Sequence, residues 1–231
     1  MEVRRLSGTD GARQARGLAV VIDVFRAFTT AAFIMANGAD RIIPVEGIDE
    51  AFRIRGEHPA WVLAGEEHGF KVPGFDYGNS PADVEHVDFT GRTVIQRTSS
   101  GTRGIALSSG ADEVLPGSFV MADAIIRHIN RSHPDVVCLV AMGWEGERPA
   151  LEDDLCAEYI EAKLMGAEPD FQGMCRRIRE DPSGAKFFGP DQTTFKERDF
   201  QLAMSLNQFG FTLRVERGDY PYFRIVDGKS V

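Results

Sequence analysis

Apolar and polar residues follow one another along this chain in a pattern that predicts short buried strands separated by helices. Residues 18–25 form a β-branched apolar run, which is typical of a strand covered on both faces in a parallel sheet. Residues 26–36 are expected to form a helix, because Asn37-Gly38 favours a helix C-terminus. The same patterns predict strands at 41–45 and 61–64 and a helix at 48–56.

This order of elements recurs further along the chain. Residues 38–44, Gly-Ala-Asp-Arg-Ile-Ile-Pro, match residues 110–116, Gly-Ala-Asp-Glu-Val-Leu-Pro. A helix is then predicted at 118–132 and a strand at 136–141. We interpret this as an α/β fold of two similar α/β subdomains in tandem, with mostly parallel strands and flanking helices. A chance likeness between strand-helix units is the alternative.

The subdomains are expected at residues 1–90 and 91–231, working as one functional unit with strand ends facing a shared cleft. The second includes a C-terminal part that we expect to serve as packing, cover or interface. Helices are predicted at 151–166 and 195–209 and a strand at 222–226, whereas 167–193 shows no clear period.

Composition narrows the class of protein. Of the 231 residues, 43% are hydrophobic and 26% are charged, as in ordinary folded globular proteins. The net charge of -9 argues against general binding to nucleic acid or to anionic membranes, so an anionic substrate would need a locally basic pocket. No apolar run approaches the roughly 20 residues that span a bilayer. The cysteines, Cys138, Cys156 and Cys175, show no disulfide or zinc spacing, so we expect a cytoplasmic protein.

Residues 65–81 form a long polar loop directly after the apolar run 61–64. The loop contains four glycines, several charges and an Asn-Ser-Pro end. Such loops at strand ends are where α/β proteins usually carry their chemistry. Glu66, Asp76, Asn79 and Ser80 are its candidate site residues.

Asp23 is an acid at the end of an apolar strand. A buried carboxylate costs several kcal/mol unless it is paired or binds a metal. Two interpretations stay open: a structural pair with Arg26, or a metal-binding or catalytic role.

The segment 97–103, Arg-Thr-Ser-Ser-Gly-Thr-Arg, lies between a predicted strand and a helix. Its hydroxyl groups, backbone N–H groups and arginines could hold a phosphate or sulfonate, although a helix cap with a solvated turn is an equal alternative. Residues 152–154, Glu-Asp-Asp, begin a later helix and could simply complement its dipole. Together with Asp23, Glu66 and Asp76, they could instead supply oxygen ligands to Mg²⁺.

Four segments together resemble the 2-phosphosulfolactate phosphatase family, the ComB-like enzymes of coenzyme M biosynthesis. The resemblance covers about residues 18–166 in matching order and spacing. It is carried by residues 21–30 (Val-Ile-Asp-Val-Phe-Arg-Ala-Phe-Thr-Thr), the loop 65–81, residues 97–105, and 151–156 (Leu-Glu-Asp-Asp-Leu-Cys).

The resemblance implies a Mg²⁺-dependent phosphatase of α/β fold that converts 2-phosphosulfolactate to sulfolactate and phosphate. It implies a small anionic phosphorylated substrate as the partner. From the net charge we expect no nucleic-acid or membrane partner, and a homodimer is a further possible assembly. We assign the candidate roles as follows: catalytic Asp23, Glu66, Asp76 and Asp154; metal-binding Asp23, Glu66 and Asp153; substrate-binding Arg26, Asn79, Ser80, Ser99, Ser100, Thr102 and Arg103.

Three positions depart from the family pattern. Glu67 stands where the family has Arg, Ser100 replaces an Asn, and Gln96-Arg97 replaces Thr-Thr. The charge reversal at Glu67 would weaken an anion contact made there. Two alternatives therefore remain: a paralogue acting on another phosphorylated acid, or a catalytically silent protein that binds an anionic metabolite.

Overall fold

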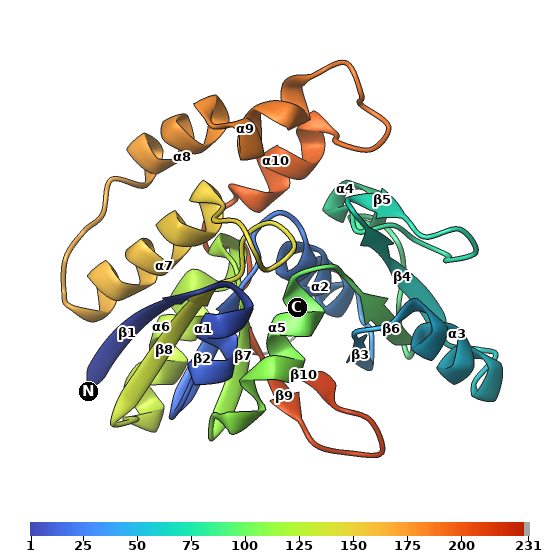
Figure 1. Cartoon of the computed structure of the whole chain (residues 1–231), viewed down its shortest axis with the longest axis horizontal. Coiled ribbons are helices and arrows are strands. Elements are labelled where there is room, and N and C mark those ends of the chain that lie inside the picture. Colours follow the sequence, from blue (N-terminus) through green and yellow to red (C-terminus); the bar gives the residue numbers. More distant parts are fainter. Residues whose placement is uncertain (229–231) are drawn as a thin grey trace.

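Two β-sheets form the framework of the computed structural model, which describes residues 1–228 (Figure 1). Sheet A is entirely parallel and has the order β1-β8-β2-β7. Its strands are β1 (Glu2–Ser7), β8 (Val136–Ala141), β2 (Leu18–Ile22) and β7 (Glu113–Gly117). All five residues of β2 are buried, as expected for a strand covered on both faces.

Sheet B is mixed and has the order β5-β4-β6-β3-β10-β9. Strands β4, β6 and β3 are parallel, whereas β5, β10 and β9 pair antiparallel. The strands are β5 (Phe70–Lys71), β4 (Val62–Glu67), β6 (Thr93–Arg97), β3 (Arg41–Val45), β10 (Tyr222–Val226) and β9 (Thr212–Glu216). Strand β9 also lies against β7, where the two sheets meet. The predicted α/β class is confirmed.

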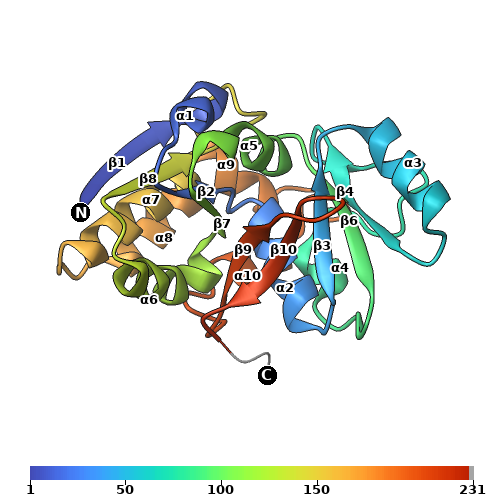
Figure 2. The same ribbon diagram turned by 90° about the horizontal axis from the view of Figure 1, so that it is seen from below.

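Helices surround both sheets (Figure 2). Helices α1 and α5 contact one face of sheet A and α6 and α7 the other, while α2 is buried between the sheets. The α-helices are α1 (Gly8–Gln14), α2 (Ala27–Ala36), α3 (Ile48–Glu57), α4 (Pro81–Val84), α5 (Gly101–Leu107), α6 (Ala122–Ser132), α7 (Leu151–Leu164), α8 (Phe171–Glu180), α9 (Pro182–Ala185) and α10 (Glu197–Ala203). The 3₁₀ turns within residues 1–228 are η1 (Ser108–Gly110), η2 (Phe119–Met121) and η3 (Lys186–Phe188).

The two similar chain segments are interleaved in space. In sheet A, β2 from the first segment lies between β8 and β7 from the second. In sheet B, β6 from the second segment lies between β4 and β3 from the first. In each sheet, a strand from one half of the sequence therefore lies between two strands from the other half.

Helices α8 to α10 extend over the carboxyl ends of the strands (Figure 1). Helix α8 packs on α7 beside sheet A, and α10 packs on α4 beside sheet B. Helix α8 lies in the segment 167–193, which showed no clear period in the sequence. The helix expected over 195–209 is shorter, because it ends at Ala203 and Asn207 takes a left-handed conformation with φ 58°.

A group of charged side chains fastens the C-terminal strands to sheet A. His128 of α6 contacts Glu113 of β7 at 2.9 Å and also bonds Asp227. The hydrogen bond to Glu113, supported by the Asp227 contact, raises the pKa of His128 although burial opposes the shift. Protonated His128 therefore joins α6, β7 and the end of β10.

We expect His128→Gln to destabilise the protein more below about pH 6.5 than above about pH 8. A histidine whose pKa is raised by folding contributes stability below its unfolded pKa, and the contribution is lost as the pH rises through the folded value. Urea unfolding at both pH values measures the difference, with His86→Gln as control because the His86 side chain is 88% exposed. An equal loss at both pH values would show that His128 contributes packing alone.

Candidate active site

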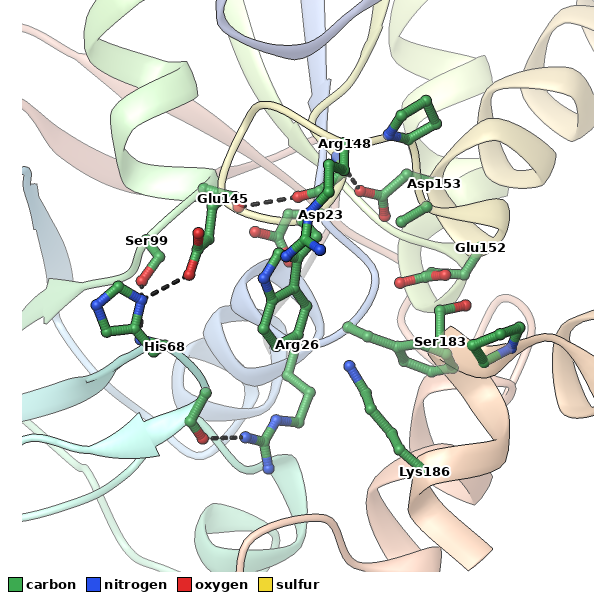
Figure 3. Close-up of a pocket in the computed structure, with 18 of the residues that line it drawn as sticks. Asp23, Arg26, His68, Ser99, Glu145, Arg148, Glu152, Asp153, Ser183 and Lys186 are labelled. Atoms are coloured by element: carbon green, nitrogen blue, oxygen red, sulfur yellow. Dashed lines mark hydrogen bonds and ion pairs between the residues drawn. The ribbon is translucent and has the colours of Figure 1, made fainter.

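A cavity of about 470 Å³ lies between the strand ends and the segment α8 to α10 (Figure 3). Residues that follow β2 and β8 of sheet A, and β4 and β6 of sheet B, line it together. Ligands of α/β proteins usually bind at the carboxyl ends of parallel strands. The predicted shared cleft is therefore found where strands of both sheets end.

Asp23, directly after β2, is buried in the cavity wall and is 6% exposed. Its Oδ1 accepts a hydrogen bond from Ala27 N at 3.0 Å, at the start of α2. The alternative pair of Asp23 with Arg26 does not form. Gly101 approaches closely, since a Cβ there would lie 2.9 Å from Asp23 Oδ2. Only glycine fits this contact.

Glu66, at the end of β4, contacts the hydroxyl-rich turn 97–103, which is the candidate anion site. Its Oε1 accepts from Ser99 N at 2.6 Å, and its Oε2 accepts from Gly69 N at 2.6 Å. Ser100 Oγ donates to Gly143 O at 2.8 Å. A carboxylate of the protein itself therefore already accepts from one backbone donor of this turn, Ser99 N.

Asp153, in the first turn of α7, links two loops. Its Oδ1 accepts from Val24 N and its Oδ2 from Gly143 N, both at 2.8 Å. The neighbouring Glu152 is also buried in the cavity wall, but its Oε2 has no hydrogen-bond partner among the described residues. In Figure 3 the Glu152 carboxylate lies close to Ser183 of α9.

Burial and mutual repulsion raise the pKa values of these acids. Burial, with repulsion from Glu66 and Glu152, raises the pKa of Asp23 to about 7, although the N–H groups of Ala27 and Gly101 oppose the shift. Burial, then the charges of Glu152 and Asp23, raises the pKa of Asp153 well above its usual range. Burial also raises the pKa of Glu152. A cation or a proton is needed to relieve this repulsion.

The basic residues of the cavity differ in whether they are already paired. Arg26 donates to Asp199 Oδ2 at 2.8 Å, to Gly69 O at 2.9 Å and to Thr194 O at 2.6 Å. Lys186 and Arg148 also line the cavity, and neither makes an ion pair within residues 1–228. Arg26 is therefore tied to the protein, and the other two remain open to a ligand.

Not all predicted site residues meet in this cavity. It is lined by Asp23, Arg26, Glu66, Asn79, Ser99, Ser100 and Asp153 from the predicted set. Asp76 lies elsewhere, where its Oδ2 accepts from Leu63 N at 2.8 Å and pairs with Arg55. Ser80 donates to Asp199 at 2.7 Å behind the wall, and Asp154 is exposed. Thr102 caps its own helix turn by bonding Thr98, and Arg103 does not line the cavity.

Several lining residues were missed by the sequence analysis. Arg148 and Trp144 follow β8, the strand equivalent to β4, so the internal likeness could have indicated that this loop reaches the cavity as the loop 65–81 does. Lys186 and Ser183 come from the aperiodic segment, where no signal marked them. His68 bonds Glu145 at 2.5 Å at the cavity, and this hydrogen bond raises the pKa of His68.

Glu67 and Arg97 both depart from the family pattern, and their opposite charges lie next to each other. Glu67 lies 3.7 Å from Arg97, and neither side chain lines the cavity. Arg97 also donates to Glu66 O at 2.6 Å. The reversed charge at Glu67 is matched by its neighbour and does not face the cavity.

Asp23, Glu152 and Asp153 form an acidic wall of the cavity, and carboxylates are ligands that Mg²⁺ prefers. Within residues 1–228, no three His, Cys, Asp or Glu side chains are grouped so as to hold a metal ion by themselves, so Asp23, Glu66 and Asp153 form no complete cage. Mg²⁺, however, is usually held by one or two carboxylates with water and substrate phosphate. The pair Asp23 and Asp153 fits that smaller requirement, and Glu152 adds a buried, unpartnered carboxylate oxygen to the same wall.

No helix within residues 1–228 is both long and apolar enough to cross a membrane.

Comparison with known proteins identifies relatives of this chain. A protein from Caldicellulosiruptor saccharolyticus is 37% identical over 156 residues, which are 66% of this chain and 64% of the relative. One from Symbiobacterium thermophilum is 35% identical over 65% of each chain. The chain thus spans less than two thirds of the length of these two relatives.

A Bacillus subtilis relative matches over more of its length, at 30% identity across 87% of this chain and 89% of the relative. All three relatives are named probable 2-phosphosulfolactate phosphatase. The family model for 2-phosphosulpholactate phosphatase matches residues 6–180, which include the strand ends and all of the acidic wall. The chain therefore belongs to the 2-phosphosulpholactate phosphatase family.

Proposed function

We propose that this chain hydrolyses the phosphate monoester of a small organic acid, with 2-phosphosulfolactate as substrate and sulfolactate and inorganic phosphate as products. The observation that carries the proposal is a cavity in which buried carboxylates and unpaired cations line the same space. Family membership and the names of the relatives support the choice of substrate. This substrate would place the chain in a coenzyme M type pathway.

The chain's own residues have definable tasks in this reaction. A water oxygen forms a bond to phosphorus while the bond between phosphorus and the lactate oxygen breaks, and the leaving oxygen takes up a proton. Asp23 can accept the proton of the attacking water, because a carboxylate holds more lone pairs than Ala27 N uses. Lys186 and Arg148 attract the anionic substrate to the acidic wall.

Mg²⁺ is the cofactor that we propose for this site, held by Asp23 and Asp153 with Glu152 beside them. When bound, it would offset the charge of the phosphoryl oxygens. We propose Asp153 and not Asp154 as the metal ligand, since Asp154 lies outside the cavity. Glu66 accepts two backbone N–H groups and is better suited to positioning the turn of Ser99.

The alternative of a catalytically silent protein has no support from the lining of the cavity. It depended on the reversed charge at Glu67, which pairs with Arg97 outside the cavity. A paralogue acting on another phosphorylated acid would use the same acidic wall, and a substrate panel separates it from the proposed activity.

Purified protein is expected to release phosphate from 2-phosphosulfolactate faster than from 2-phospholactate or glycerol 2-phosphate. Removal of divalent cations with EDTA should abolish the activity, and added Mg²⁺ should restore it, because the carboxylates otherwise repel the phosphoryl group. A phosphate-release assay measures both effects. Binding without turnover of any panel member would instead support the silent alternative.

Asp23→Asn is expected to lower kcat/KM by roughly a hundredfold or more, since the carboxylate is the proposed acceptor of the water proton. The amide oxygen can still accept from Ala27 N, whereas the NH2 group replaces the acceptor that faces Gly101 N, so we expect a folded protein of somewhat lower stability. Thermal unfolding tests that point. Asp154→Asn is the matched comparison at an exposed position, and we expect nearly unchanged activity there. Unchanged activity in Asp23→Asn would remove Asp23 from the mechanism.

A further inference from the structure

Lys186 and Arg148 approach the cavity from different directions. In Figure 3 Lys186 extends into it from below and Arg148 from above, with the acidic wall of Asp23, Glu152 and Asp153 beside them. Two separate cations in one small cavity match a ligand with two separate anionic groups. The structure further indicates which cation serves which group.

Lys186 is held by aromatic rings that leave its donors free. Its Nζ lies 4.6 Å from the ring centroid of Trp144, 5.1 Å from that of Phe195 and 5.3 Å from that of Phe187. Such rings attract a cation through their faces but contain no oxygen acceptor. The three N–H donors of the ammonium group are therefore available to a ligand oxygen.

Lys186 also faces the acidic wall. Burial lowers the pKa of Lys186, whereas the negative charges of Glu152, Asp23 and Asp153 oppose that shift. An anion bound to Lys186 would lie between this ammonium group and the carboxylates. That is the position at which a phosphoryl group must react with water activated by Asp23.

Arg148 lies at the rim of the same cavity. It ends a short hairpin in which Trp144 N donates to Arg148 O at 2.8 Å, and its guanidinium lies 6.0 Å from the Trp144 ring centroid. Its side chain is exposed and has no ion-pair partner within the described residues. A guanidinium can bind two oxygens of one sulfonate or carboxylate.

We propose that Lys186 binds the phosphoryl oxygens and that Arg148 binds the acid group which stays on the organic fragment. This inference rests on the proposed function and assigns specificity for a second acid group to Arg148. Phosphate esters that lack such a group would use only one of the two cations, so they would bind weakly.

Binding of the two products separately tests the assignment without relying on turnover. Isothermal titration calorimetry would measure inorganic phosphate alone, and then sulfolactate in the presence of saturating phosphate, both with Mg²⁺. We expect Lys186→Gln to weaken phosphate binding by about tenfold or more. We expect Arg148→Gln to weaken sulfolactate binding by a similar factor while leaving phosphate binding within about twofold. Arg13→Gln, which removes an exposed charge that does not line the cavity, is the matched control.

Each result has a defined meaning. If both variants weaken phosphate and sulfolactate equally, or neither variant differs from Arg13→Gln, the division of roles is overturned. If the unaltered protein binds neither product, the two-cation site is also overturned. The expected binding pattern in a protein that hydrolyses no phosphate ester would leave this inference standing and remove the proposed function. Hydrolysis by the unaltered protein, together with unaltered product binding in both variants, would support the proposed function and overturn this inference.

Discussion

Hydrogen bonds from backbone N–H groups to buried carboxylates hold the cavity together. Asp153 accepts from the loops that follow β2 and β8, and Glu66 accepts from the turn that follows β6 and from its own hairpin. Without such donors, each buried charge would cost several kcal/mol. Asp153 thereby fixes loops of sheet A, and Glu66 fixes loops of sheet B. The hydrogen bond from Ser100 Oγ to Gly143 O at 2.8 Å joins the two sets of loops. The framework and the chemistry of the site therefore depend on the same few contacts.

Because a buried carboxylate needs N–H donors, the acids at the strand ends both position loops and attract a cation. Asp23, Glu66 and Asp153 each position a loop, yet their mutual repulsion leaves a wall that favours a cation. The ion pair of Arg26 with Asp199 adds a second connection, because Asp199 also accepts from Ser80 and Ala82 N. The polar loop 65–81, Arg26 and α10 are thus joined behind the cavity, and α8 to α10 are held over the strand ends.

The sequence predicts those parts of the molecule that local patterns specify. Continuous apolar runs indicated β2 and β8, since strands buried on both faces need apolar residues throughout. Strand β1 was missed because it is a sheet edge with mostly exposed side chains. Asp23, Glu66 and Asp153 could be predicted as acids at element ends. The sequence could not show that Asp76, unlike these three acids, lies outside the cavity, because its position depends on the path of the loop. Lys186 gave no local signal, and only the packing of α8 to α10 brings it to the cavity.

Interleaving of the two similar segments gives the cavity its unequal walls. The central strand β2 is followed by an acid, Asp23, whereas its counterpart β6 is followed by the hydroxyl turn containing Ser99 and Ser100. The turn after β6 offers N–H donors, and Glu66, from the segment that contains β2, occupies the donor of Ser99. Acceptors of one segment thus satisfy donors of the other. The bonds from Ser99 N to Glu66 and from Val24 N to Asp153 each join the two segments, so segments folded as two separate sheets would leave both carboxylates without these donors.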